Sequence, residues 1–339
     1  MSTQVEIGLN AVIIAVTDKE PRLLTVNWDR QFSLEAYDQL RPPPSTLNAI
    51  PFGPLDPSAD RTLELALRGW VKKQTGLELD YVEQLYTFGD RNRDPRERYG
   101  GKRSISVAYL ALVQENETFD IAQARWRNIY DFFPWEDWRT GAPEIIQAVI
   151  APALEAWVEQ GVSQKVRRQR RERIDMTFGL GDAGWDNYRV LDRYELLYEI
   201  EVAFEAQWDR ACQQKTLPPP HQHNHFGCPM ILDHRRILAA ALGRIRGKLK
   251  YRPLVFDLLP SLFTLSQLQH VVEALAGLPL HKQNFRRFVE KAGLVESTGQ
   301  MDTQTGGRPA ALFRFRRDVL TEHQSPGVGL PVTIPQKNT

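Results

Sequence analysis

The sequence predicts a mixed α/β domain, then a helical segment, then a small basic helix–turn–helix domain. Three observations support this order. Strand-like runs surround one amphipathic helix through about residue 154, longer helical periods follow, and the net charge turns strongly positive near the C-terminal end. With 339 residues, 42% of them hydrophobic and 25% charged, the chain is expected to be a globular protein of more than one domain.

The first domain contains four predicted strands and one predicted helix. The strands are rich in β-branched and aromatic residues and cover residues 5–16, 22–27, 81–88 and 104–113. Residues 60–75 follow a helical period, with Leu63, Leu67 and Trp70 at i, i+4 and i+7. Gly76 is expected to end this helix, because glycine readily adopts the left-handed conformation after the last turn.

A helical segment follows the first domain. Residues 144–173 are predicted to be helical and end in the charged run KVRRQRRER, which we interpret as a solvated helix face. Residues 190–212 form a second long helix candidate, and residues 233–247 form a third, after a Pro-rich loop. We interpret the tryptophans of this segment as packing residues.

The charge distribution is uneven, although the whole chain has a net charge of only +1. Residues 234–320 contain 15 Lys and Arg against 6 Asp and Glu, a net charge of +9. A compact basic segment on an acidic body favours a polyanionic partner such as DNA.

The basic segment has the pattern of a helix–turn–helix. Thr264 and Gln267 form a predicted capping box in front of an apolar stripe. A second helix is expected over 281–292, with Phe285 and Val289 on its buried face. Its outward or boundary residues are predicted to contact DNA, and these are Lys282, Gln283, Asn284, Arg286, Arg287 and Lys291.

Two short strands are predicted after the second helix, over residues 294–298 and 311–317. The polar tip between them would form a wing, and Arg308 in that tip is suited to a narrow minor groove. The alternative interpretation is a small helical module that binds another protein.

The segment from Gly53 to Leu77 resembles the Nudix box, the motif with which Nudix hydrolases hold magnesium at a diphosphate. That chemistry needs several carboxylates as metal ligands. This chain instead has Gly69, Trp70, Lys73 and Gln74 at the positions of the box's Arg-Glu and Glu-Glu pairs, and the nearest acid on the helix is Glu64. The resemblance therefore implies a Nudix-like fold without hydrolase activity.

Two further stretches resemble the NrtR group of Nudix-related regulators of NAD metabolism. The first is QLYTFGDRNRDPR followed by SISVAYLALV, and the second is AAALGRIRGKLKY with the helix pair and the GGRPA wing. NrtR proteins are usually shorter. The roughly 90 extra residues here, which begin with a Pro-Trp-Glu-Asp-Trp-Arg run at Pro134, resemble the longer NadQ branch.

The resemblance implies a fold, a division into domains and a set of ligand-binding residues. The fold is an α/β Nudix-like domain (an α/β/α sandwich on a mixed sheet), a helical insert and a C-terminal winged helix. The domains are 1–154 (sensor), 155–232 (insert), 233–320 (linker helix and winged helix) and 321–339 (tail). The expected effector is ADP-ribose, NAD or ATP, held by Phe52, Arg61, Arg91, Arg93, Arg96 and Arg103.

A metal site in the Pro-rich loop is a weaker alternative. Its ligands would be His221, His223, His225 and Cys228, but their spacing differs from that of structural zinc sites. The chain has only two cysteines, no apolar run long enough to span a membrane and no leader-like start, so we expect a cytoplasmic protein without disulfides or a cofactor.

The resulting hypothesis is a homodimeric repressor that binds a double-stranded DNA operator near genes of NAD biosynthesis or salvage. The dimer is expected because one winged helix reads only a short half-site. Two alternatives stay open: a sugar-responsive regulator of the same architecture, and a residual hydrolase of ADP-ribose or another nucleoside diphosphate.

Overall fold

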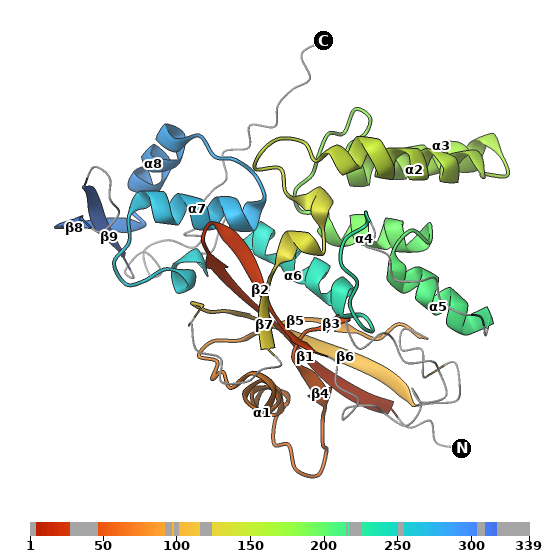
Figure 1. The fold of residues 1–339 in the computed structure, drawn as a ribbon, viewed down its shortest axis with the longest axis horizontal. Helices are drawn as coiled ribbons and strands as arrows, with labels where there is room; N and C mark the ends of the chain where they lie inside the picture. Colours follow the sequence, from red (N-terminus) through yellow and green to blue (C-terminus); the bar gives the residue numbers. More distant parts are fainter. Residues whose placement is uncertain are drawn as a thin grey trace.

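The computed structural model describes residues 5–27, 47–91, 97, 102–115, 124–214, 216, 225–249, 254–303 and 309–316. Within these ranges a mixed sheet lies between helices, and a helical insert and a winged helix pack on one side of it (Figure 1). The predicted fold class is confirmed.

A seven-stranded sheet forms the centre of the first domain. Its strands are β1 (Val5–Thr17), β2 (Glu20–Asn27), β3 (Asn48–Ala49), β4 (Phe52–Pro54), β5 (Glu83–Phe88), β6 (Arg103–Leu112) and β7 (Ala124–Asn128). The order β3-β2-β1-β6-β5 is mixed, since β1 is parallel to β6 and antiparallel to β2. β4 also pairs with β1, and β7 pairs with β2.

The central strand β1 is buried on both faces, as a three-layer sandwich requires. Leu9, Ala11 and Ile13 belong to one apolar cluster, together with Leu67 and Val71 of α1 (Leu63–Thr75). The alternate residues Val12 and Ile14 belong to a second cluster with residues of α6 (His234–Lys248). Because side chains alternate across a strand, one run of apolar residues supplies both cores.

Helix α1 is bounded by its caps. The side chain of Thr62 accepts a hydrogen bond from the Leu65 amide, so the helix begins at Leu63 rather than at residue 60. Gly76 ends it with φ of 74°, as expected.

The insert contains more helices than the sequence predicted. The expected helix over 144–173 is a π-turn (Ile146–Ile150), α2 (Ala151–Glu159) and α3 (Gln164–Phe178), with the chain reversing around Gly161. The expected helix over 190–212 is α4 (Val190–Glu199) and α5 (Phe204–Gln214). The prediction that 144–173 is helical is confirmed, but the single helix over 190–212 was wrong, because a periodic apolar pattern continues across a short turn.

The basic run of the insert lies inside α3. Its arginines form ion pairs with nearby acids, for example Arg167 with Glu159 and Arg171 with Glu155. The interpretation as a solvated helix face is confirmed. Trp135 and Trp185 are buried in the core, as expected of packing residues.

The C-terminal domain has helix–turn–helix geometry. It comprises a 3-10 turn (Leu254–Leu258), α7 (Leu265–Ala276), α8 (Lys282–Lys291) and a hairpin of β8 (Val295–Asp302) and β9 (Ala310–Phe315). The capping box at the start of α7 is present: Thr264 accepts from the Gln267 amide, and the Gln267 side chain accepts from the Thr264 amide. Its apolar residues share the second cluster with α6 and the insert.

Candidate nucleic-acid interface and effector site

Two neutral side chains of α1, Trp70 and Gln74, form hydrogen bonds with the backbone of β4. The Gln74 side chain exchanges two hydrogen bonds with the Phe52 backbone, at 2.9 Å from the amide and 2.8 Å to the carbonyl oxygen. The Trp70 indole donates to the Pro54 carbonyl oxygen at 2.9 Å. Its ring packs so closely on Gly53 that an added Cβ there would lie 2.1 Å from it. These residues therefore fasten α1 to β4.

Glu64 on this helix and Glu78 just after it are paired with cations. Glu64 accepts from Arg68 at 2.8 Å, and Glu78 accepts from Lys72 at 2.6 Å, which lowers the pKa of Glu78. Lys73 lies over the Trp70 ring at 4.9 Å from its centre. Among the described residues, no group of three or more His, Cys, Asp or Glu is arranged to hold a metal ion. His221 and His223 lie outside the described residues, so the loop site in which we placed them with His225 and Cys228 is untested.

Of the predicted effector residues, Phe52 and Arg103 lie on strands of the sheet, at separate positions. Arg103 donates to the Gly89 carbonyl oxygen at 2.8 Å, which brings β6 to the loop that carries the exposed Arg91. Phe52 lies opposite Asn10 on β1, whereas Arg103 lies opposite Val5. Five residues of strand separate the two positions by about 17 Å. Arg61 is exposed before α1, and Arg93 and Arg96 lie outside the described residues.

A buried histidine lies beside Phe52 and was not among the predicted site residues. The His234 ring meets Phe52 edge-on with 4.8 Å between ring centres, and its Nδ1 accepts from the Ile50 amide at 3.2 Å. Burial lowers the pKa of His234 to about 3, so the ring is neutral. The signal that could have found it is the histidine at the start of an amphipathic helix, whose first turn faces the sheet.

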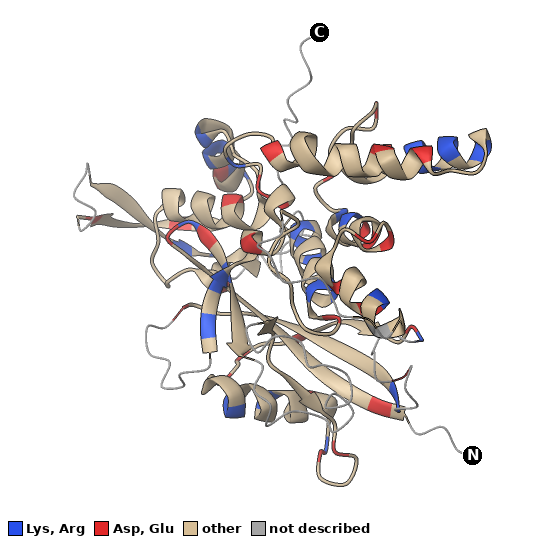
Figure 2. Cartoon of the chain, turned by 45° about the vertical axis from the view of Figure 1, so that its right-hand side comes forward, with Lys and Arg blue, Asp and Glu red and all other residues tan. Residues whose placement is uncertain are grey.

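Helix α8 presents the predicted DNA-contacting side chains to solvent. Phe285 and Val289 are buried, while the predicted residues Lys282, Gln283, Asn284, Arg286, Arg287 and Lys291 are all exposed. None of the four cations of α8 forms an ion pair within the described part of the chain. Figure 2 shows Lys and Arg gathered on this helix. Arg308, predicted at the wing tip, lies outside the described residues.

The basic side chains of α6 are paired within the protein. Its cations pair with the body of the protein: Arg235 with Glu205, Arg236 with Glu195 and Asp233, Arg246 with Glu136, and Lys248 with Glu83. Arg244 donates to the Leu85 carbonyl oxygen at 3.3 Å. Acids, most of them from other segments, therefore neutralise the charge of α6 locally, whereas the cations of α8 stay exposed.

A comparison with family models identifies the C-terminal domain. Residues 255–315 match the NrtR DNA-binding winged helix domain. This domain is therefore an NrtR-type winged helix. A curated relative, the ADPR responsive transcriptional repressor NtrR of Acinetobacter baylyi, is 41% identical over 86 residues, which are 25% of this chain and 34% of the relative. The alignment thus spans about a third of that relative's length.

Solved structures show the same architecture across most of this chain. Shewanella oneidensis NrtR complexed with a 27mer DNA superposes with a TM-score of 0.52 at 20% identity, covering 93% of this chain and 95% of that one. A MutT/nudix family protein from Enterococcus faecalis gives a TM-score of 0.50 at 14% identity, covering 93% and 88%. These two likenesses show the fold. No described helix of the chain is both long and apolar enough to cross a membrane.

Proposed function

We propose that this protein is a DNA-binding transcriptional repressor that responds to ADP-ribose or a related adenine nucleotide. The observation that carries the proposal is α8, a helix in the recognition position of an NrtR-type winged helix. It has four cations on its exposed face and no internal ion pair to occupy them among the described residues. Residues at its N-terminal end would contact base edges, and arginines further along would contact phosphates.

The proposed DNA-contacting residues are Lys282, Gln283, Asn284, Arg286, Arg287, Lys291 and Arg308. A single winged helix reads a short half-site, so we propose a homodimer on a two-fold operator. A light-scattering mass of twice the chain mass in solution supports this, and a monomeric mass on operator DNA excludes it. The proposed targets are genes of NAD biosynthesis or salvage, consistent with the group that the sequence resembles.

The proposed effector site comprises Phe52, Arg61, Arg91, Arg93, Arg96 and Arg103 of the Nudix-like domain. The contact of Arg103 with the Gly89 carbonyl oxygen supports a cluster of arginines at the loop after β5. The planar guanidinium fork suits a diphosphate. The Acinetobacter relative is an ADPR responsive repressor, which favours ADP-ribose over NAD and ATP as the effector.

We propose further that the Nudix-like domain binds this nucleotide without hydrolysing it. Metal-assisted attack on a diphosphate requires carboxylates that hold Mg²⁺. Here Gln74 is hydrogen-bonded to the Phe52 backbone, and Glu64 and Glu78 are paired with cations. Turnover of ADP-ribose with Mg²⁺ at an ordinary enzymatic rate would refute this part.

The test is a gel shift with promoters of NAD-synthesis genes, each with and without ADP-ribose, NAD, ATP or a pentose. The proposal predicts a shifted band on at least one promoter and a response to a nucleotide. A response to a pentose alone would support a sugar-responsive regulator instead. No shift on any of these promoters would refute the NAD assignment.

A further inference from the structure

The turn between α7 and α8 is held by residues from elsewhere in the chain. The Tyr130 hydroxyl donates to the Ala274 carbonyl oxygen at 2.6 Å, and Arg246 Nε donates to the Leu275 carbonyl oxygen at 3.2 Å. The Trp138 amide donates to the Gly277 carbonyl oxygen at 2.7 Å. The last carbonyl oxygens of a helix have no hydrogen-bond donor within the helix, so these contacts supply the donors that the winged helix itself does not.

Gly277, the residue that ends α7, fits tightly against the same groups. Its φ is +67°, and a Cβ built on it would lie 2.4 Å from the Glu136 carbonyl oxygen and 2.8 Å from the Tyr130 hydroxyl. The first residue of the turn therefore touches both the 3-10 turn Ile129–Asp131 and the 3-10 turn Pro134–Glu136. α8 begins only five residues later, at Lys282, so a displacement of Gly277 moves the recognition helix.

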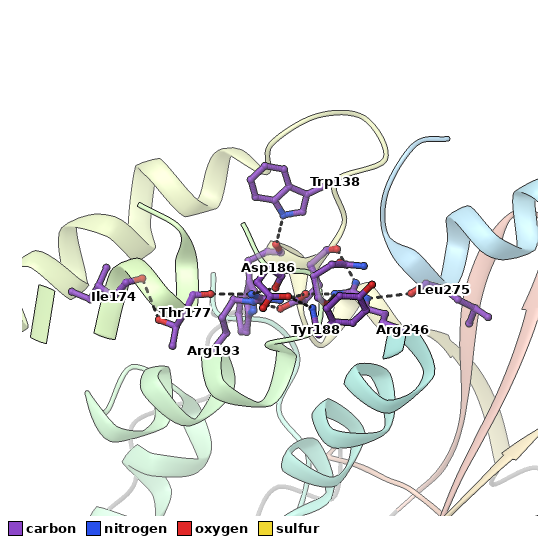
Figure 3. Close-up of polar contacts among 11 residues, drawn as sticks. Trp138, Ile174, Thr177, Asp186, Tyr188, Arg193, Arg246 and Leu275 are labelled. Atoms are coloured by element: carbon purple, nitrogen blue, oxygen red, sulfur yellow. Dashed lines mark hydrogen bonds and ion pairs between the residues drawn. The ribbon is translucent and has the colours of Figure 1, made fainter. Parts of the chain in front are cut away.

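A buried ionic cluster holds the 3-10 turn Pro134–Glu136, which Gly277 contacts. The Glu136 carboxylate accepts from Arg193 Nε at 2.6 Å and from Arg246 Nη1 at 2.5 Å, and all three side chains have no exposed surface. Arg193 also donates to the Thr177 and Asp186 carbonyl oxygens (Figure 3). Burial raises the pKa of Glu136, but the two arginines outweigh it and keep the carboxylate ionised. The insert and α6 thus hold the Pro-Trp-Glu-Asp-Trp-Arg run in place through the buried contacts of Glu136.

The segment that carries these contacts also belongs to the Nudix-like sheet. We define the strap as residues 124–139, which begin as β7, paired with β2 from Arg22 to Val26. The strap ends at Arg139, which donates to the Lys19 carbonyl oxygen at 2.5 Å, in the turn between β1 and β2. Both ends are therefore attached to the β1–β2 hairpin, and the middle holds the turn before α8.

We propose that the strap sets the orientation of α8 relative to the Nudix-like sheet, and that it transmits the effector's influence to the DNA-binding surface. The transmission of the effector's influence by the strap rests on the proposed function. A ligand shifts an equilibrium only by its differential affinity for two arrangements. The strap supplies a direct route by which a shift of the sheet changes the position of the recognition helix.

The first test needs no ligand and compares hydrogen exchange in the full chain. Tyr130→Phe removes the donor to the Ala274 carbonyl oxygen and keeps the ring, whereas Tyr86→Phe makes the same change on the exposed edge strand β5. We expect amides of the α7–α8 turn to exchange about fivefold faster in Tyr130→Phe, the effect of one buried hydrogen bond. If these amides exchange equally fast in both variants, the strap does not hold the turn before α8.

The second test measures coupling, as the ratio of DNA affinities without and with ADP-ribose. We expect Tyr130→Phe to move this ratio about fivefold towards one while the affinity for ADP-ribose is unchanged. Gly277→Ala should act the same way, and Gly184→Ala is its matched control, because Gly184 also has a positive φ (+70°) but open space around its Cβ position.

The outcomes separate the two proposals. If the parent protein binds no promoter or ignores ADP-ribose, the proposed function fails, and the exchange comparison still decides whether the strap holds the turn. If the parent protein responds normally and Tyr130→Phe keeps the parent's ratio, the strap does not transmit the signal. If Gly277→Ala does not fold, Tyr130→Phe alone decides.

Discussion

Replacing Glu136 by Gln should be among the most destabilising conservative changes in this protein. The carboxylate accepts three hydrogen bonds from two buried guanidinium groups, at 2.6 and 3.0 Å from Arg193 and 2.5 Å from Arg246. Glutamine has nearly the same shape, but it removes the only negative charge in the triad and turns an N–H towards a cation. Two buried positive charges would then face each other without a carboxylate.

The expected loss follows from that geometry. Removing one partner of a buried ion pair costs about 3–5 kcal/mol, because the desolvated charge left behind has nowhere to go. Urea unfolding, followed by tryptophan fluorescence, should show a midpoint lower by about 1–1.7 M for a slope of about 3 kcal/mol per molar.

The matched control is Asp137→Asn, the same chemical change one residue along. Asp137 pairs with Arg139 at 2.7 Å, but their side chains are 28% and 21% exposed, and a partly solvated pair is worth about 1 kcal/mol or less. Equal midpoints for the two variants would refute the claim that the buried triad holds the insert and α6 together.

Three further predictions concern other parts of the chain. His234 is neutral in the folded state because burial lowers its pKa from 6.5 to about 3. The free energy of unfolding is therefore unaffected by this group above pH 6.5 and falls by at most about 5 kcal/mol as the pH drops from 6.5 towards 3. His234→Asn should flatten this pH dependence in urea titrations, and an unchanged dependence of the unfolding free energy on pH contradicts the assignment. The double variant Arg286→Ala, Arg287→Ala should weaken DNA binding and reduce the slope of log affinity against log salt by about 2. Its affinity for ADP-ribose, measured by calorimetry, should stay constant. An unchanged slope would show that α8 does not contact phosphates. Gln74→Glu should lower the free energy of unfolding by about 1–3 kcal/mol, because a carboxylate cannot donate to the Phe52 carbonyl oxygen. Lys73→Glu, at an exposed position, should be nearly neutral. If the two variants melt at the same temperature, the Gln74 hydrogen bonds do not stabilise the fold.

Local patterns in the sequence were sufficient to predict most of the elements that position the two sites. The capping box at Thr264 and the apolar face of α8 are short-range features, and the structure contains both. The two-sided burial of β1 follows from its unbroken apolar run, which is typical of a strand between two layers.

The partners of charged residues could not be predicted from local patterns. Arg235 and Arg246 look like ordinary helix cations in the sequence, yet each is buried and meets an acid or a carbonyl oxygen more than 25 residues away. The break between α4 and α5 at Glu201, with φ of 60°, also leaves no glycine or proline to mark it. Such features depend on tertiary packing, which no window of sequence contains.

The most direct test of the proposed function is a fluorescence anisotropy titration of the intact protein on a labelled NAD-gene promoter, with and without ADP-ribose, against an unrelated duplex of the same length. We expect the promoter to be bound at least about a thousandfold more tightly than the unrelated duplex at physiological salt, and ADP-ribose to change this affinity at least about fivefold. Equal affinity for both duplexes, unaffected by ADP-ribose, would contradict it.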